Sequence, residues 1–379
     1  MKKLLVLAIS LLLTIGCSKE DTNQIDNDQA VFNEYSLTLS NQPAFMVGKD
    51  LDVNYFNDIT VGVISYTSNS IKLLTSAGNQ TIVLSGTNLE NINAAKTVIT
   101  PNYSENNSFY RNYVGAGQLI KDKNGKIYSI THGEWHNGKI INYNNVPGFY
   151  ASVGITTSID NGETFQMMPT PIISDYYGWN YDSGQADSGL AEPSITFNKD
   201  STSVFVYYVD HNRTGRNVNI NMVKFDVSKN GVPDFTKCYF LKNNNTFTTD
   251  LIRSKEVVVG PEIADALFPH VTFNKTTNTF LMVYCLNDYD EYFKIGQPTK
   301  SGIYIRESID GINWTKSAQK IKSGWAVPFN LTAAYMWHPT LIYSNNSQTE
   351  GYLLFSQSLN GLTKDGHKMW AQKFQLVKK

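Results

Sequence analysis

The feature that most constrains the fold of this chain is a unit of four short apolar runs that recurs along it. In the clearest copy the runs are GQLIKD (117–122), KIYSITHGE (126–134), YASVGITTSID (150–160) and ETFQMM (163–168). Alternation of apolar and polar residues over such short lengths is typical of β-strands with one buried face. Four such strands in succession, separated by short turns, predict an antiparallel meander.

The copies of this unit follow one another at a nearly constant spacing. Their first runs begin at Gly117, Pro193, His270 and His338, which are 76, 77 and 68 residues apart. Repeated four-stranded meanders are typical of the blades of a β-propeller. The last copy has three runs, and residues 31–100 contain enough further runs for one more blade and for a strand that completes the last one. We therefore predict an all-β, five-bladed propeller over 31–379; another division of the N-terminal part would make six blades.

The N-terminus has the anatomy of a secretory signal. In residues 1–17, MKKLLVLAISLLLTIGC, two lysines precede an apolar run that is too short to span a membrane. The Gly16–Cys17 pair resembles the lipobox of bacterial lipoproteins, which implies that Cys17 carries a lipid anchored in the outer membrane. Residues 18–30 are polar without an aromatic residue and predict a flexible tether. Acidic residues soon after Cys17 resemble the surface-export signal of Bacteroidetes lipoproteins, so we expect exposure on the cell surface.

The charge balance and the cysteines exclude several classes of function. The chain has 32 basic and 33 acidic residues, and without the signal's two lysines the balance is 30 to 33. No basic run appears, so we expect no nucleic-acid partner. Cys238 and Cys285 lie in apolar runs, where a disulfide and two buried thiols both remain open. The cysteine spacing is not that of a metal site. We predict no cofactor and no metal, because His270 and His338 lack a third ligand in register.

Two segments of similar sequence, SIDNGETF (158–165) and SIDGINW (308–314), predict hairpin turns. An Asp side chain bonds the amides that follow it, and Gly accepts positive φ. The segments resemble the Asp boxes, or BNR repeats, of sialidases and other β-propeller proteins. The residues that carry the resemblance are Ser158, Asp160, Gly162, Ser308, Asp310 and Gly311. It implies a structural turn and does not identify a reaction.

Propeller topology sorts the remaining residues between the two ends of the channel. The first strand of each blade lines the channel, so its start lies at the same end as the loop between the second and third strands. We call this end the top. All six histidines and five of the six tryptophans fall in or beside top segments: His132, His136, His211, His270, His338, His367, Trp135, Trp179, Trp325, Trp337 and Trp370.

This collection of aromatic and polar side chains suits a carbohydrate. The C–H faces of a sugar stack on aromatic rings, and its hydroxyls take directed hydrogen bonds. The predicted substrate-binding residues are His132, Trp135, Arg213, His270, Trp337 and His338. Arg213 can also hold a carboxylate or sulfate in bidentate fashion. Long loops collect uncommon residues without any binding role as well, and this alternative stays open.

Four carboxylates are the predicted catalytic residues: Glu134, Asp187, Glu192 and Glu262. Glu134 ends the second strand of a blade, and apolar neighbours such as Trp135 would raise its pKa toward that of a general acid. The other three precede channel-lining strands, and Pro193 biases Glu192 toward an extended backbone that points inward. Two of the four should lie about 5–10 Å apart, the range that glycoside hydrolysis uses. Each can instead have a structural role in its loop.

Residues 105–377 resemble the five-bladed propeller glycosidases of the arabinanase and xylosidase-like superfamily. The resemblance rests on carboxylates at successive channel-strand starts, the closure by a terminal blade and the S-x-D-G-x-x-W turn. It implies a base Asp at the start of the first blade, an Asp that tunes pKa values and an acid Glu on a later blade. Because YVGAGQL, from Tyr113, has no Asp at its start, Glu134 or Asp187 would be the base. Glu192 or Glu262 matches the acid.

Three functions follow from these observations. The first is a surface glycoside hydrolase that acts on a polysaccharide or oligosaccharide through paired carboxylates. The second is a polysaccharide lyase in which His and Tyr abstract a proton beside a uronate. The third is a surface lipoprotein that binds glycans without catalysis. An unsaturated uronate absorbs in the ultraviolet and a hydrolysed end does not, so a product assay separates the first two. Binding without turnover identifies the third.

Overall fold

The described part of the chain is built from β-strands. The structure is a computed structural model that describes residues 35–53, 58–105, 108–141, 146–174, 187–211, 218–242, 245–250, 264–288, 300–315, 317–325, 335–358 and 367–378, all within the unit Phe32–Lys379. The side chains of 137–141, 146–148, 187–188 and 264–265 lie outside the description. Within these ranges no helix is long and apolar enough to cross a membrane.

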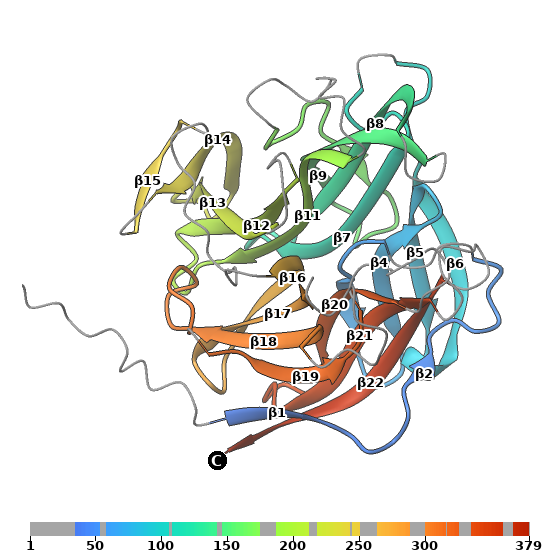
Figure 1. Cartoon of the computed structure of the whole chain (residues 1–379), viewed down its shortest axis with the longest axis vertical. Helices are drawn as coiled ribbons and strands as arrows, with labels where there is room; N and C mark the ends of the chain where they lie inside the picture. The colour runs from blue at the N-terminus through green and yellow to red at the C-terminus, as the bar shows by residue number, and fades with distance from the viewer. Residues whose placement is uncertain are drawn as a thin grey trace, which may run out of the picture. The chain divides into compact units, whose positions relative to one another are not determined.

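The strands form consecutive antiparallel meanders (Figure 1). The first comprises β3 (Gly62–Tyr66), β4 (Ile71–Ala77), β5 (Gln80–Gly86) and β6 (Ile92–Ile99). The second comprises β7 (Tyr113–Lys121), β8 (Ile127–Ile141), β9 (Val146–Ser158) and β10 (Gln166–Met167). The third comprises β11 (Asp187–Phe197), β12 (Ser203–Asp210), β13 (Ile220–Val227), β14 (Pro233–Lys242) and β15 (Thr246–Thr248).

Two further meanders complete the series. The fourth comprises β16 (Ala264–Asn274), β17 (Thr279–Asp288), β18 (Gly302–Ser308) and β19 (Gln319–Ser323). The fifth comprises β20 (Tyr335–Tyr343), β21 (Glu350–Ser358) and β22 (His367–Lys378), joined by β1 (Tyr35–Leu39) and β2 (Phe45–Met46). β1 pairs antiparallel with β22 from Tyr35↔Lys378 to Leu39↔Phe374. The prediction that an N-terminal strand completes the last unit is therefore confirmed.

The first strand of each meander contacts the first strand of the next. β3 contacts β7, β7 contacts β11, β11 contacts β16 and β16 contacts β20. Between the last and the first, the backbone N–H of Val61 donates to Thr340 Oγ1 at 3.0 Å. This is the topology of a β-propeller, and it confirms the all-β class and the antiparallel meanders.

Buried hydrogen bonds also link these inner strands. Ser194 Oγ donates to Gln118 Oε1 at 2.6 Å, and Gln118 Nε2 donates to the carbonyl of Val271 at 2.7 Å. The N–H of Val271 in turn donates to Ser194 Oγ at 2.8 Å. Because buried polar groups are costly when unpaired, this network favours one register of β7, β11 and β16.

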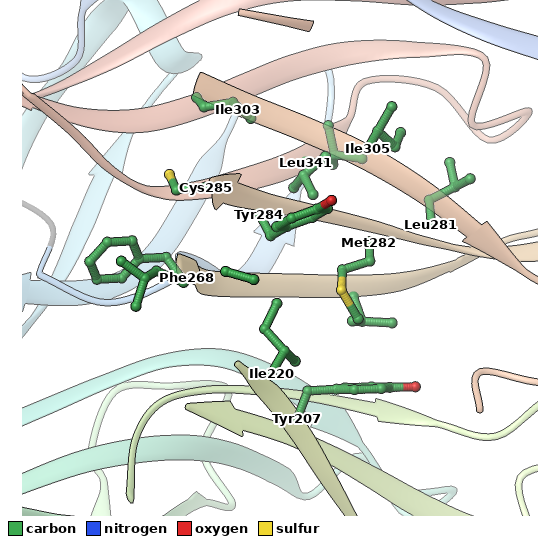
Figure 2. Packing of buried hydrophobic residues seen from close by; sticks show 14 of the residues in the cluster. Tyr207, Ile220, Phe268, Leu281, Met282, Tyr284, Cys285, Ile303, Ile305 and Leu341 are labelled. Atoms are coloured by element: carbon green, nitrogen blue, oxygen red, sulfur yellow. The ribbon is translucent and has the colours of Figure 1, made fainter. Parts of the chain in front are cut away.

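The hydrophobic core lies between neighbouring meanders. In β12 every residue is buried, because its sheet has neighbours on both faces. Figure 2 shows Tyr207 and Ile220 of the third meander facing Phe268, Met282 and Tyr284 of the fourth. Cys238 and Cys285 are both free, so the disulfide alternative is excluded.

Four inner strands carry a bulge at the same place. Two residues face one on the partner strand between Ala116 and Leu119 in β7, Ala191 and Ser194 in β11, Leu267 and His270 in β16, and Trp337 and Thr340 in β20. In three of them the first extra residue has positive φ and precedes a proline: Glu192 (φ 55), Phe268 (φ 56) and His338 (φ 48). The prediction of an extended Glu192 was wrong, because the extra residue of a bulge turns the chain locally.

The two S-x-D segments form turns between antiparallel strands, β9–β10 and β18–β19. In the second, Asp310 Oδ1 accepts the N–H groups of Ile312 and Asn313, both at 2.8 Å. Ser308 Oγ accepts the N–H of Gly311 at 2.9 Å, and the carbonyl of Gly311 accepts the hydroxyl of Tyr207 at 2.6 Å. The turn is thereby attached to the neighbouring meander. In the first turn, Asp160 Oδ1 accepts the N–H groups of Glu163 and Thr164 at 3.1 and 3.0 Å.

Asp310→Ala is expected to destabilise the fold without affecting a site at the top. It removes the acceptor of two backbone amides in a partly buried turn, which costs on the order of 1–3 kcal/mol. The melting temperature should fall, and turnover per folded molecule should be unchanged. The more exposed Asp160→Ala should lower the melting temperature less. A well-folded but inactive Asp310→Ala protein would contradict a structural role.

Candidate active site

Glu134 lies on β8 between two histidines on the same side of the strand. Successive residues of a strand point to opposite faces, so His132, Glu134 and His136 share one face. Glu134 Oε2 lies 2.8 Å from His136 Nε2, and its Oε1 lies 3.5 Å from His132 Nε2. The Glu134 side chain is 12% exposed, so a ligand can reach only part of this carboxylate.

Glu192 is held by groups from two other strands. Its Oε2 accepts the backbone N–H of Phe268 at 3.2 Å, and its Oε1 lies 3.3 Å from Nε2 of His211, the residue that follows β12. The side chain is 11% exposed. Two nitrogens therefore fix the orientation of this carboxylate.

Asp58, which the sequence analysis missed, is the third carboxylate. It stands just before β3, the inner strand of the first meander, whereas the sequence analysis looked for an opening Asp only at Tyr113, where β7 begins. Its N–H donates to Ser76 Oγ and its carbonyl accepts the hydroxyl of Tyr113, both at 2.9 Å. Its Oδ1 lies 3.3 Å from His338 Nε2, and its side chain is 33% exposed. The signal that could have found it was its position directly before the apolar run ITVGVISYT.

The three carboxylates all influence the pKa of the buried His132. Burial lowers the pKa of His132, and the negative charges of Glu134, Asp58 and Glu192 oppose this shift. For Asp58, burial alone would raise the pKa. The hydrogen bond to His338 and the charges of the surrounding histidines outweigh burial, so the pKa of Asp58 is lowered. These histidines are His338, His367 and His132.

An aromatic cluster lies beside Asp58. The ring centroids of Tyr335 and Trp337 lie 4.4 Å apart. The ring centroid of Trp337 lies 5.1 Å from that of His367 and 5.9 Å from that of Phe268. His367 is 1% exposed, contacts Ser356 Oγ, and has a pKa lowered to about 4 by burial. The partly exposed Trp337 and Trp135 can offer ring surface to a sugar.

His270, a predicted substrate-binding residue, contacts a neighbouring inner strand. Its Nδ1 accepts the N–H of Leu341 at 3.4 Å, and burial lowers its pKa to about 3. It lines a cavity of about 250 Å³ along the inner strands, together with Gln118, Thr272 and Tyr343 among others. The contacts described for its ring are thus with β20 and this cavity, whereas His132 contacts Glu134.

Some predicted residues lie outside the description. The backbone of Asp187 is in β11, opposite Phe149, but its side chain is not described. Glu262, Arg213 and Trp179 lie outside the described residues altogether. We predicted from the sequence that two of the four carboxyl groups of Glu134, Asp187, Glu192 and Glu262 lie about 5–10 Å apart, and this stays a prediction. In the described ranges no group of three or more His, Cys, Asp or Glu side chains is arranged to hold a metal ion.

Comparison with known proteins finds likeness in structure alone. No family model matches the sequence, and no curated protein matches it. The structure of an α-L-arabinofuranosidase from Lactobacillus brevis is similar with a TM-score of 0.52 and 10% identity, covering 85% of this chain and 91% of that one. A structure described as a glycoside hydrolase has a TM-score of 0.51 and 13% identity, covering 89% of this chain and 92% of that one.

The chain has a glycoside hydrolase-like fold. Both of these solved structures share most of their length with it, so the likeness extends over the whole propeller and is not confined to one blade. At such low identities the likeness is one of fold, and a fold can host many activities. A function for this chain therefore has to be inferred from its carboxylates.

Proposed function

We propose that this chain is a glycoside hydrolase whose reacting groups are Asp58 and Glu192, with Glu134 as a third carboxylate of the site. The observation that carries the proposal is that three carboxylates with limited exposure, from three neighbouring meanders, each lie within 3.5 Å of a histidine ring nitrogen. Glycoside hydrolysis requires one carboxylic acid to protonate the leaving oxygen and one carboxylate to activate water or attack the sugar. A cluster of three partly buried carboxylates can supply both.

Asp58 is proposed as the base or nucleophile. Its lowered pKa keeps it ionised at neutral pH, and an ionised carboxylate can take a proton but cannot give one. It also opens the first meander, where the glycosidase resemblance puts the base. With one third of its side chain exposed, it is the most accessible of the three carboxylates.

Glu192 is proposed as the acid and Glu134 as the group that tunes and orients the site. Glu192 lies on a later meander than Asp58, as the resemblance implies for the acid. Glu134 lies on the meander between them and contacts two histidines. The partly exposed Trp337 would stack against a sugar ring, with its indole supported by Tyr335.

A panel of polysaccharides and oligosaccharides tests the proposal. The chain without residues 1–17 should release reducing ends from at least one glycan, with no rise in ultraviolet absorbance. Absorbance from an unsaturated uronate would instead identify a lyase. One observation favours the lyase, which would use a His and a Tyr to abstract a proton. The ring centroids of Tyr113 and His132 lie 5.4 Å apart. Burial raises the pKa of Tyr113, which makes it a poor base at neutral pH.

We also propose that the protein is held on the outer cell surface through Cys17. The support is the Gly16–Cys17 pair after an apolar run and the polar stretch that follows it. Cys17→Ala should release the protein from the membrane fraction or stall its processing. Cys238→Ala is the matched control and should stay in that fraction. An unchanged membrane fraction for Cys17→Ala would contradict the lipid anchor.

A further inference from the structure

The three pre-proline bulge residues, Glu192, Phe268 and His338, form a continuous chain of contacts. The backbone N–H of Phe268 reaches Glu192 Oε2 at 3.2 Å. The ring of Phe268 meets the ring of His338 edge-on, with centroids 4.4 Å apart. His338 Nε2 in turn lies 3.3 Å from Asp58 Oδ1. The contacts therefore run from the proposed acid to the proposed base across β11, β16 and β20.

We propose that Phe268 is a positioning residue that, together with His338, fixes the separation between Asp58 and Glu192. The inference rests on the proposed function, because it assigns Asp58 and Glu192 as the reacting pair. Phe268 itself is 6% exposed and acts through its neighbours. A hydrolase needs this separation held, since it selects between direct attack on the sugar and activation of water.

The bulge explains how the backbone of Phe268 reaches Glu192. Phe268 and Pro269 together oppose the single residue Tyr284, because β16 and β17 pair at Leu267↔Cys285 and next at His270↔Val283. The N–H of Phe268 therefore lies outside the regular ladder and is directed at the carboxylate. Proline next to it contributes no N–H of its own.

Backbone strain at Phe268 supports the same role. A positive φ is unfavourable for a residue other than glycine and persists only where the surrounding structure holds the residue in place. A bulky residue such as Phe is a genuine outlier there. Around Phe268, the rings of Trp337 and His338 hold the side chain while Glu192 holds the amide. The strained residue is thus fixed from both sides.

His338 links the position of the Phe268 ring to the position of the Asp58 carboxylate. It is 2% exposed, and its buried Nδ1 has no hydrogen-bond partner among the described residues. An ionised carboxylate only accepts hydrogen bonds, so Nε2 carries the proton in this contact. The contact with Asp58 is therefore the hydrogen bond described for this ring. The Phe268 ring limits rotation of this imidazole.

The groups around Asp58 determine how its pKa would change if His338 moved. His338 of β20, His367 of β22 and His132 of β8 lower its pKa, and the hydroxyl of Tyr113 binds its carbonyl. On its other side the N–H of Asp58 binds Ser76 of β4. If the ring of His338 moves away, the hydrogen bond that lowers the pKa of Asp58 is lost. The pKa of Asp58 then rises, and the acid limb of the pH–rate profile moves to higher pH.

The test compares Phe268→Leu with Phe273→Leu in the otherwise complete chain. Phe273 lies on the same strand, is partly buried and packs on Phe280 at 5.1 Å, away from the carboxylates. Phe268→Leu should lower kcat by about tenfold to 100-fold, the size expected for a misplacement of up to about 1 Å. KM should change little, and the acid limb should move to higher pH. Phe273→Leu should leave kcat and the pH profile unchanged.

Crystal structures of the wild type and Phe268→Leu test the inference separately from the proposed function. The distance between the Asp58 and Glu192 carboxyl groups should change in Phe268→Leu and stay constant in Phe273→Leu. An unchanged distance, or kinetics equal to those of Phe273→Leu, would overturn the positioning role. If the wild type cleaves no glycan, the proposed function fails while the distance still decides the structural claim.

Discussion

Asp58→Asn is expected to lower kcat by at least about 100-fold while the fold and sugar binding are retained. The amide has the shape of the carboxylate but cannot take a proton or attack a sugar. The contacts of the Asp58 backbone with Ser76 and Tyr113 do not depend on the side chain and should persist. Stopped assays on the glycan found in the panel measure the rate, and calorimetric titration measures binding.

The control is Asp52→Asn, an exposed aspartate six residues earlier, which should keep full activity. For the wild type, kcat/KM should stay constant as the pH is lowered to below 3.8, the ordinary pKa of an aspartate. The reason is that the folded environment lowers the pKa of Asp58. Asp58 must be ionised to act, so activity is lost only when the pH falls through its lowered pKa. An active Asp58→Asn enzyme would remove Asp58 from the mechanism.

Glu192→Gln is the second change with a large expected effect. The general acid protonates the leaving oxygen, so the amide should cost at least about 100-fold in kcat on natural glycosides. Glycosides with a good aryl leaving group need little protonation, so their loss should be much smaller. This difference between substrates is the signature of an acid and distinguishes Glu192 from Asp58. The amide oxygen introduced by the substitution can still accept the N–H of Phe268, so the bulge should be retained.

Glu350→Gln, at an exposed position at the start of β21, is the matched control and should behave as the wild type. Rates on an aryl glycoside and on the natural glycan should be measured side by side, with melting temperatures to verify folding. Equal losses on both substrates would show that Glu192 is not the acid. Glu134 would then be the next candidate, because it is the third carboxylate of the proposed site and contacts His132 and His136.

Local sequence patterns were sufficient to predict the strands. The alternation of apolar and polar residues indicates which face of a strand is buried, and this pattern can be read from neighbouring residues in the sequence. The nearly constant spacing of the runs indicated the meanders, and the surplus run near residue 35 indicated the strand that pairs with β22. Glu134 and Glu192 were identified because both occur at the ends of such runs, where a strand meets the top of the channel.

The site itself was decided by the tertiary structure. Asp58 and His338 are 280 positions apart, and only the closure between the last and first meanders brings them together. The positive φ of Glu192 and the contact from Phe268 depend on bulges, whose register is set by packing between sheets and not by the preference of a residue before proline. The sequence by itself therefore determined the repeated strands and two of the three carboxylates. The tertiary structure alone decided the third carboxylate and the contacts that orient all three, because those contacts join residues distant in the chain.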